Sequence, residues 1–309
     1  MAKKANKTRA TAKTAPRSRT AGMRFNDAAE RYARLLADPC NGDLVPGPFG
    51  DGYGGMVARF EKEYVINNTG TDTCAFLAYT PATNTINISS TPITDETNVL
   101  TLAALPAASL PGHVFLQNNA SSFRTLACCM QVYWPGSELN RQGIISLGRY
   151  PGEVSNDTAL TVNGVRSTSV YIKRMPADTF EIIWRPTESD LISREPVATP
   201  AVGSGSNWGL TSLVTTASGI PVSTGIRVRI VVVFEWMPDP VSGFKTTIVR
   251  QPNPVRLADV LARLDKAGDW MSGTAHAAGR AISSLYGGVG SIMSLGNGIN
   301  RIGRALLAA

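Results

Sequence analysis

The amino-acid sequence predicts an all-β protein built as an antiparallel sandwich or barrel. Apolar residues make up 43% of the chain and charged residues only 17%, and Thr, Ser, Gly, Pro and Asn are concentrated in its middle. Between residues 57 and 236, short segments with a hydrophobic period of two alternate with turn residues, which is typical of strands joined by short turns. No ten-residue helical pattern lies between these segments, so parallel strands linked by helices are disfavoured.

The first 26 residues carry a dense positive charge and no acid. The candidate RNA-binding residues of this segment are Lys3, Lys4, Lys7, Arg9, Lys13, Arg17, Arg19 and Arg24. Subtracting these eight bases from the chain's 30 Lys and Arg leaves 22 bases against 23 acids, so the net positive charge lies in this one segment. Such a block is typical of a disordered arm that binds a polyanion, and we expect that polyanion to be RNA. A transit peptide is the alternative, but the segment has no apolar helical face.

Residues 27–56 are expected to form a short helix followed by a linker. NDAAERYARLLA (Asn26–Ala37) places a capping Asn before early acids and spaces Tyr32, Leu35 and Leu36 along one helical face. Residues 38–55 then contain three prolines and six glycines, which excludes a regular element. We expect the glycines of this linker to act as a hinge.

The β domain, residues 57–240, contains ten candidate strands. Alternation is clearest in VARFEKEYVI (Val57–Ile66). GIRVRIVVVFEW (Gly225–Trp236) is apolar on both faces across IVVVF, which predicts a central strand. The remaining candidates are Cys74–Tyr79, Thr85–Ser90, Asn98–Leu102, Ser122–Trp134, Gly143–Gly148, Thr168–Arg174, Thr179–Arg185 and Leu210–Thr216.

Residues 241–309 are expected to form an amphipathic helical tail that can act on membranes. Asn253 is a suitable helix cap, with Pro254 at the first helical position. Ala281–Asn300 are twenty residues without a charge, flanked by Arg280 and Arg301, a length that could span a bilayer core. The apolar residues assigned to this activity are Ile282, Leu285, Val289, Ile292, Ile299 and Ile302. The alternative is that the apolar stripe packs against the protein itself.

The sequence contains no recognisable catalytic set, so we expect no enzymatic activity. Its two histidines, His113 in a predicted loop and His276 in the tail, lie in no metal-ligand or nucleophile motif. Phosphate-binding glycine motifs are absent as well. Aromatic residues are 7% of the chain and scattered, so no surface for stacking bases is predicted.

Two further expectations concern metal ions and redox state. Asp38, Asp43 and Asp51 lie in the glycine-rich linker and are candidate ligands for calcium at subunit interfaces, with solvated loop acids as the alternative. No apolar leader segment follows the start of the chain, which favours a reducing compartment. We therefore predict free thiols at Cys40, Cys74, Cys128 and Cys129.

The order of basic arm, β domain and amphipathic tail resembles the coat proteins of small icosahedral positive-strand RNA viruses, of the nodavirus-like and tombusvirus-like kind. FRTLACCMQVYWPGSELNRQGIISLG (Phe123–Gly148) resembles a long strand, polar loop and following strand of their jelly roll. STGIRVRIVVVFEWMP (Ser223–Pro238) resembles its closing strand. The resemblance covers residues 57–240.

This resemblance implies a single eight-stranded jelly roll that self-assembles into an icosahedral shell, with T=3 geometry, and packages single-stranded genomic RNA through the arm. It also implies a location in the virion, in the host cytoplasm during assembly, and contact with a host membrane during entry. Nodavirus coats release a membrane-active peptide by cleavage at an Asn-Ala bond. The only such bond here is Asn119–Ala120, so the tail offers no matching site.

Two other classes of protein share parts of this organisation. A non-viral β-rich RNA-binding protein would share the arm, but it is expected to add stacking aromatics or a basic sheet face. A pore-forming protein would share the tail and would not need the arm.

Overall fold

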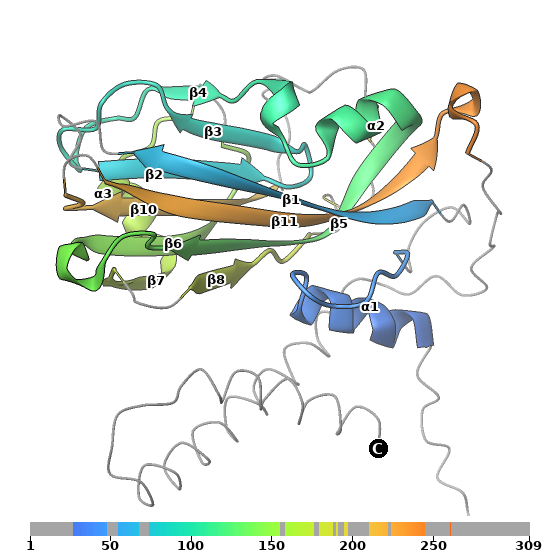
Figure 1. Cartoon of the computed structure of the whole chain (residues 1–309), viewed down its shortest axis with the longest axis horizontal. Coiled ribbons are helices and arrows are strands. Elements are labelled where there is room, and N and C mark those ends of the chain that lie inside the picture. Colours follow the sequence, from blue (N-terminus) through green and yellow to red (C-terminus); the bar gives the residue numbers. More distant parts are fainter. Residues whose placement is uncertain are drawn as a thin grey trace, which may run out of the picture.

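The computed structural model consists of two antiparallel β-sheets that pack face to face (Figure 1). It describes residues 27–47, 55–67, 74–154, 158–175, 179–187, 190, 195–196, 210–221, 224–244 and 260. The strands are β1 (Met56–Asn67), β2 (Cys74–Thr80), β3 (Thr85–Ser89), β4 (Leu102–Ala104), β5 (Ala120–Tyr133), β6 (Ile144–Pro151), β7 (Ser169–Arg174), β8 (Phe180–Ile183), β9 (Glu195–Pro196), β10 (Thr211–Ser218) and β11 (Gly225–Pro238). The helices are α1 (Asp27–Ala37), α2 (His113–Asn119) and α3 (Val162–Ser167), with short 3₁₀ turns η1 (Ala107–Ser109), η2 (Glu138–Asn140) and η3 (Pro240–Ser242).

The strand order identifies the sandwich as a jelly roll. The first sheet has the order β1-β11-β5-β8, with β9 also paired to β5, and the second has the order β4-β3-β2-β10-β6-β7. We set β3, β4 and β9 aside and renumber the eight remaining strands from 1 to 8 along the chain. The order is then 1-8-3-6 in the first sheet and 2-7-4-5 in the second. Two interlocked Greek keys produce this order. The predicted all-β jelly roll is thus confirmed, and β11 is central as predicted.

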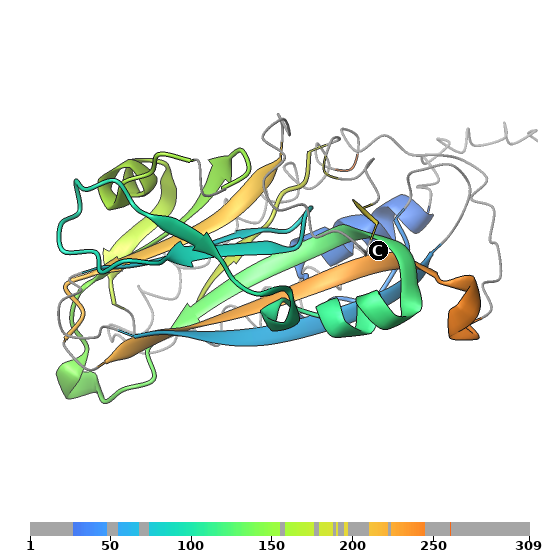
Figure 2. The same cartoon turned by 90° about the horizontal axis from the view of Figure 1, so that it is seen from above.

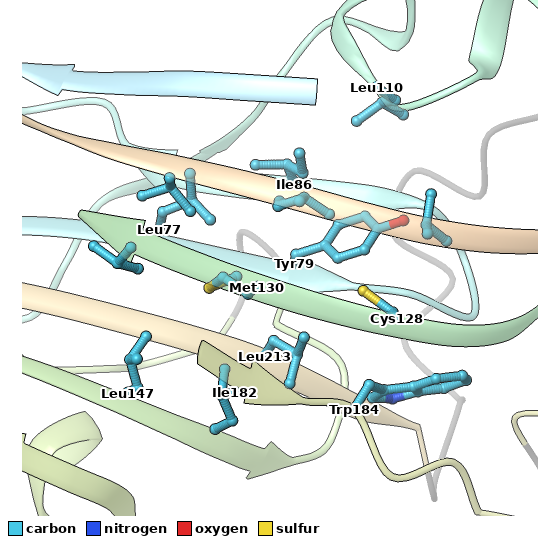
Figure 3. Close-up of a cluster of buried hydrophobic side chains, with 14 of the residues drawn as sticks. Leu77, Tyr79, Ile86, Leu110, Cys128, Met130, Leu147, Ile182, Trp184 and Leu213 are labelled. Carbon is cyan, nitrogen blue, oxygen red and sulfur yellow. The ribbon is translucent and has the colours of Figure 1, made fainter. Parts of the chain in front are cut away.

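The space between the sheets is filled by alternate side chains of both sheets. Leu77 and Tyr79 of β2 lie opposite Cys128 and Met130 of β5, and Trp184 closes one end of this layer (Figure 3). All five side chains are buried. Because side chains alternate along a strand, the other residues of the first sheet point away from this core.

The strands of the first sheet extend beyond the second sheet, and helices cover both faces of this extension (Figures 1 and 2). On the inner face, α2 packs Leu116 into the core, and the ring of Phe115 lies 5.4 Å from that of Phe60 and 5.2 Å from that of Trp236, centroid to centroid. On the opposite face lies α1. The first sheet is therefore covered on both sides at one end.

Most predicted elements agree with the structure to within two residues; β6 ends at Pro151, three residues beyond its predicted end, and four other elements differ. The strand predicted at Asn98–Leu102 is found at Leu102–Ala104, because the backbone pairing with β3 begins at Leu102. β9, α2 and α3 were not predicted, and His113 begins α2 rather than lying in a loop. The predicted arm and almost all of the tail lie outside the described residues. Among the described helices, none is long and apolar enough to cross a membrane.

Candidate functional site

Helix α1 is held against the outward face of the first sheet, the face turned away from the second sheet. Its apolar stripe, Tyr32, Leu35 and Leu36, is fully buried against Leu126, Ala127 and Val233. Arg31 and Arg34, on the opposite side of the helix, are exposed. The predicted amphipathic helix is confirmed, and it places the attachment point of residues 1–26 on this face.

A bulge in β5 shapes the surface on which α1 packs. Ala127 pairs with Val233 and Thr125 pairs with Phe234, so Leu126 is an extra residue in β5. A bulge interrupts strict alternation, and Leu126 and Ala127 consequently both pack in the α1 cluster. The Tyr32 hydroxyl donates a 2.7 Å hydrogen bond to the Leu126 carbonyl. Burial raises the pKa of Tyr32 far above its usual value, so this phenol remains a neutral donor.

A buried ion pair lies beside this cluster. Arg124 of β5 and Glu235 of β11 form a salt bridge in which the side chains are only 3% and 1% exposed. The Arg124 Nε donates to Glu235 Oε2 at 2.5 Å, and the backbone N–H of Gly55 donates to Oε1 at 3.0 Å. A Cβ atom at Gly47 would lie 3.2 Å from the Arg124 guanidinium and 2.9 Å from a Leu126 methyl. Gly47 and Gly55, the described linker residues on either side of residues 48–54, are therefore packed against the ion pair.

Two exposed ion pairs lie on another part of the outward face. Glu63 pairs with Arg227 at 2.5 Å and accepts from the Tyr133 hydroxyl, and these contacts lower the pKa of Glu63. Glu61 forms a salt bridge with Arg229. Because each of these bases faces an acid, this part of the sheet offers little net positive charge to a polyanion.

The structure describes two of the three predicted calcium ligands, Asp38 and Asp43. Asp38 caps the turn after α1, where its Oδ1 accepts from the backbone N–H and side-chain amide of Asn41 at 3.1 and 3.2 Å. Asp43 is exposed, and Asp51 lies outside the described residues. Calcium binding at these three acids stays a prediction.

The prediction of four free thiols is wrong for two cysteines. Cys40, three residues after α1, forms a disulfide with Cys129 on the outward side of β5, with a Cα–Cα distance of 6.1 Å. Cys74 and Cys128 are free and buried. Cys128 and Cys129 do point to opposite faces of β5, as their adjacency predicts. The pairing was missed because the two cysteines are 89 residues apart, and nothing local to either one indicates the partner.

One edge of the second sheet, formed by β7, exposes apolar side chains. β7 pairs only with β6 among the described strands. Its residues Val170, Tyr171 and Ile172 are 52%, 42% and 50% exposed, and Ile144 at the neighbouring end of β6 is exposed as well. Unpaired edges with exposed apolar side chains favour association with another chain. We refer to Ile144 and Val170–Ile172 as the β7 patch.

The β1 edge of the first sheet differs from the β7 patch in its charge. β1 pairs only with β11 among the described strands, and its middle residues Glu61, Lys62 and Glu63 are all exposed. Charged side chains on an edge strand oppose edge-to-edge pairing. Between the β1 and β7 edges, β7 is therefore the better candidate for a contact with another chain.

The sequence-predicted functional residues and the described surfaces overlap only in part. The eight bases of the arm and the six apolar residues of the tail lie outside the described residues. Of the tail, residues 241–244 and Val260 are described, and Val260 is buried in the same cluster as Tyr32 and Leu35. Part of the tail thus shares the outward face with α1.

Comparison with solved structures assigns the fold. No protein-family model and no curated protein matches the sequence. The structure matches the T13 viral particle of infectious bursal disease virus (IBDV) with a TM-score of 0.57 and 10% identity, over 78% of this chain and 93% of that chain. The chain has the jelly-roll fold of viral capsid proteins.

Two further matches support this assignment and bear on particle size. The VP2 subviral particle of infectious bursal disease virus matches with a TM-score of 0.54 and 10% identity, over 77% of this chain and 95% of that one. The T=1 particles derived from this virus match with a TM-score of 0.53 and 10% identity, over 85% of this chain and 98% of that one. Because these similar capsid folds build particles named T13 and T=1, the fold does not fix the triangulation number, and T=3 stays a prediction for this chain.

Proposed function

We propose that this chain is a non-enzymatic capsid protein that self-assembles into an icosahedral shell and packages single-stranded RNA through residues 1–26. The observation that carries the proposal is the segregation of charge: eight bases and no acid precede Asn26, and this segment joins a jelly roll on one face of its first sheet. The chain would then be located in the virion, and in the host cytoplasm during assembly.

The position of α1 supports an arm on the inner side of the shell. The helix and Val260 are buried on the outward face of the first sheet, so the residue range that follows the arm and one residue of the tail both contact that side. The charge-balanced remainder of this face leaves the arm as the main polyanion-binding segment. Its binding to RNA is expected to be electrostatic and independent of base sequence.

The β7 patch is the proposed contact between subunits. Burial of exposed apolar side chains is the main driving force of protein association, and a second copy of this chain is the partner that a shell supplies. Val170→Glu with Ile172→Glu should give folded subunits that do not form particles. Val114→Glu is the matched control, because Val114 is 54% exposed and lies on α2. If the control blocked assembly as strongly as the double variant, the assignment to β7 would be wrong.

The proposed RNA packaging is tested by removing the arm. Deletion of residues 2–24 should leave the β domain folded and strip nuclease-resistant RNA from the particles. With eight bases in contact with phosphates, binding of the intact protein to single-stranded RNA should show a log-log salt slope of roughly −5 to −6. Equal RNA content in truncated and intact particles would overturn this role of the arm.

The proposed membrane activity of the tail rests on Ala281–Asn300, which carry no charge and lie between arginines. A peptide of residues 255–309 should release dye from anionic liposomes, because a cationic amphipathic segment binds such surfaces. Leu285→Asp with Ile292→Asp should abolish the release. An inactive wild-type peptide, together with failed assembly of the double variant, would instead assign the tail to structure.

A non-viral β-rich RNA-binding protein is the alternative function. The two are distinguished by sedimentation and electron microscopy of the purified full chain. Closed particles that contain nuclease-resistant RNA support the capsid role, and a discrete monomer or dimer without RNA contradicts it.

A further inference from the structure

The disulfide between Cys40 and Cys129 connects two parts of the molecule that have different roles. Cys40 follows α1, the helix that leads to the arm, and Cys129 is a buried residue of β5 in the first sheet. The bond adds a covalent anchor to the noncovalent contacts of α1, which include the burial of Tyr32 and Leu35 and the hydrogen bond from Tyr32 to Leu126.

The surrounding geometry permits only this pairing. All four cysteines of the chain lie in the described residues. Cys128 points into the core between the sheets, where burial raises the pKa of its thiol and keeps it a poor nucleophile. Cys74 is buried in a separate cluster on the other face of the second sheet. Cys40 packs instead with Cys129, Val231 and Ile183 on the outward face of the first sheet.

We propose that the Cys40–Cys129 disulfide is a redox-controlled clamp on segment 27–47. The clamp is closed in an oxidising environment, where it fixes the segment and the attachment point of the arm to the sheet. A low-molecular-weight thiol such as glutathione opens it and frees the segment to leave the sheet. The consequence for RNA release rests on the proposed function, whereas the clamp itself is a property of the subunit.

The opening reaction balances with two reductant thiols. The residue Cys40 is 6% exposed, whereas Cys129 is fully buried. The thiolate of the first reductant molecule therefore attacks the sulfur of Cys40. The S–S bond breaks, Cys129 leaves as a thiolate and takes up a proton, and a mixed disulfide remains on Cys40. A second reductant thiolate then displaces Cys40, which is protonated in turn. The protein gains two electrons and two protons, and the reductant becomes its own disulfide.

A zinc site is the competing interpretation of the same residues. Ligand atoms of Cys40, Cys129 and the Glu181 carboxylate all lie within 4.8 Å of one another. Two thiolates and a carboxylate are zinc ligands. Glu181 already accepts a 2.8 Å hydrogen bond from Gln131 and has no part in a disulfide, so its substitution separates the two interpretations.

The test uses the full chain, oxidised and then treated with dithiothreitol, with or without added zinc. Alkylation and peptide mass spectrometry should find Cys40 cross-linked to Cys129 before reduction and both alkylated afterwards. Amide hydrogen exchange in segment 27–47 should rise by roughly tenfold on reduction, because a local region opens more often once an anchor is lost. Exchange in β2 and β10 should not change.

Two variants serve as matched controls. Cys40→Ser should exchange like the reduced protein under both conditions, and Cys74→Ser, at a site of similar burial, should retain the wild-type response. Free thiols at Cys40 and Cys129 before reduction, or exchange in segment 27–47 that does not respond to dithiothreitol, would overturn the proposal. So would one bound zinc per subunit that is lost in Glu181→Gln. These measurements need no particles, so a failure to assemble would count against the proposed function and leave the clamp standing.

Discussion

Neutralising one partner of the buried Arg124–Glu235 pair should strongly destabilise the subunit. In Glu235→Gln the buried Arg124 guanidinium loses the charge of the carboxylate with which it forms its salt bridge. The side-chain amide also provides one acceptor oxygen in place of the two that receive the Arg124 Nε and the Gly55 N–H. Removing one partner of a buried, hydrogen-bonded ion pair typically costs about 3–5 kcal/mol, and with side-chain exposures of 3% and 1% this pair belongs to that class.

The assay is urea unfolding of unassembled full-length subunits under fixed redox conditions. The change in free energy of unfolding follows from the shift in the midpoint, provided that the slope is unchanged. The matched control is Glu61→Gln, which neutralises a pair that is 60% and 38% exposed and should cost no more than about 1 kcal/mol.

A double replacement separates the attraction within the pair from the cost of burying it. Arg124→Met with Glu235→Leu removes both charges and should recover most of the lost stability, since a well-packed apolar pair often matches a buried ion pair. A loss below about 1 kcal/mol in Glu235→Gln, or one equal to that of Glu61→Gln, would refute the reasoning.

Three further predictions concern backbone conformation, pH and calcium. Gly112→Ala should destabilise the subunit by about 1–3 kcal/mol more than Gly243→Ala. Both glycines have positive φ, but only at Gly112 would an added Cβ meet another group, the Phe60 ring at 2.5 Å. Equal losses of stability on urea unfolding would contradict this. Burial raises the pKa of Asp190 to about 6, above its unfolded value of about 3.9, so the folded state binds the proton more tightly and stability should fall by about 2 kcal/mol as pH rises from 4 to 6. Asp190→Asn should remove that slope in pH-dependent unfolding, and an unchanged slope would exclude Asp190 as its source. If the linker acids bind calcium between subunits, chelation near neutral pH should lower the melting temperature of particles, and Asp38→Asn should weaken this response; melting that is indifferent to chelator and to calcium would leave these acids as loop residues.

The sequence alone was sufficient to predict most of the strands and the all-β fold class. Period-two alternation and turn residues place β1 and β11 almost to the residue, because the environment of each side chain alternates with the pleat of its own strand. The amphipathic helix α1 was predicted for the same reason: three apolar residues at helical spacing require a surface to cover them. Charge segregation in the arm is likewise visible without a structure.

The tertiary structure decided the features that depend on residues far apart in the chain. The position of β4 follows from its pairing with β3, and α2 and α3, with seven and six residues, are too short to show a clear period. Arg124 and Glu235 look like ordinary charged residues in apolar strands, and only the pairing of β5 with β11 brings them together. The Cys40–Cys129 disulfide and the exposure of β7 likewise depend on sheet order. Local periodicity indicates which way a side chain points on its own helix or strand. Sheet order depends instead on the packing of the whole chain. The buried ion pair, the disulfide and the β7 patch all arise from that packing.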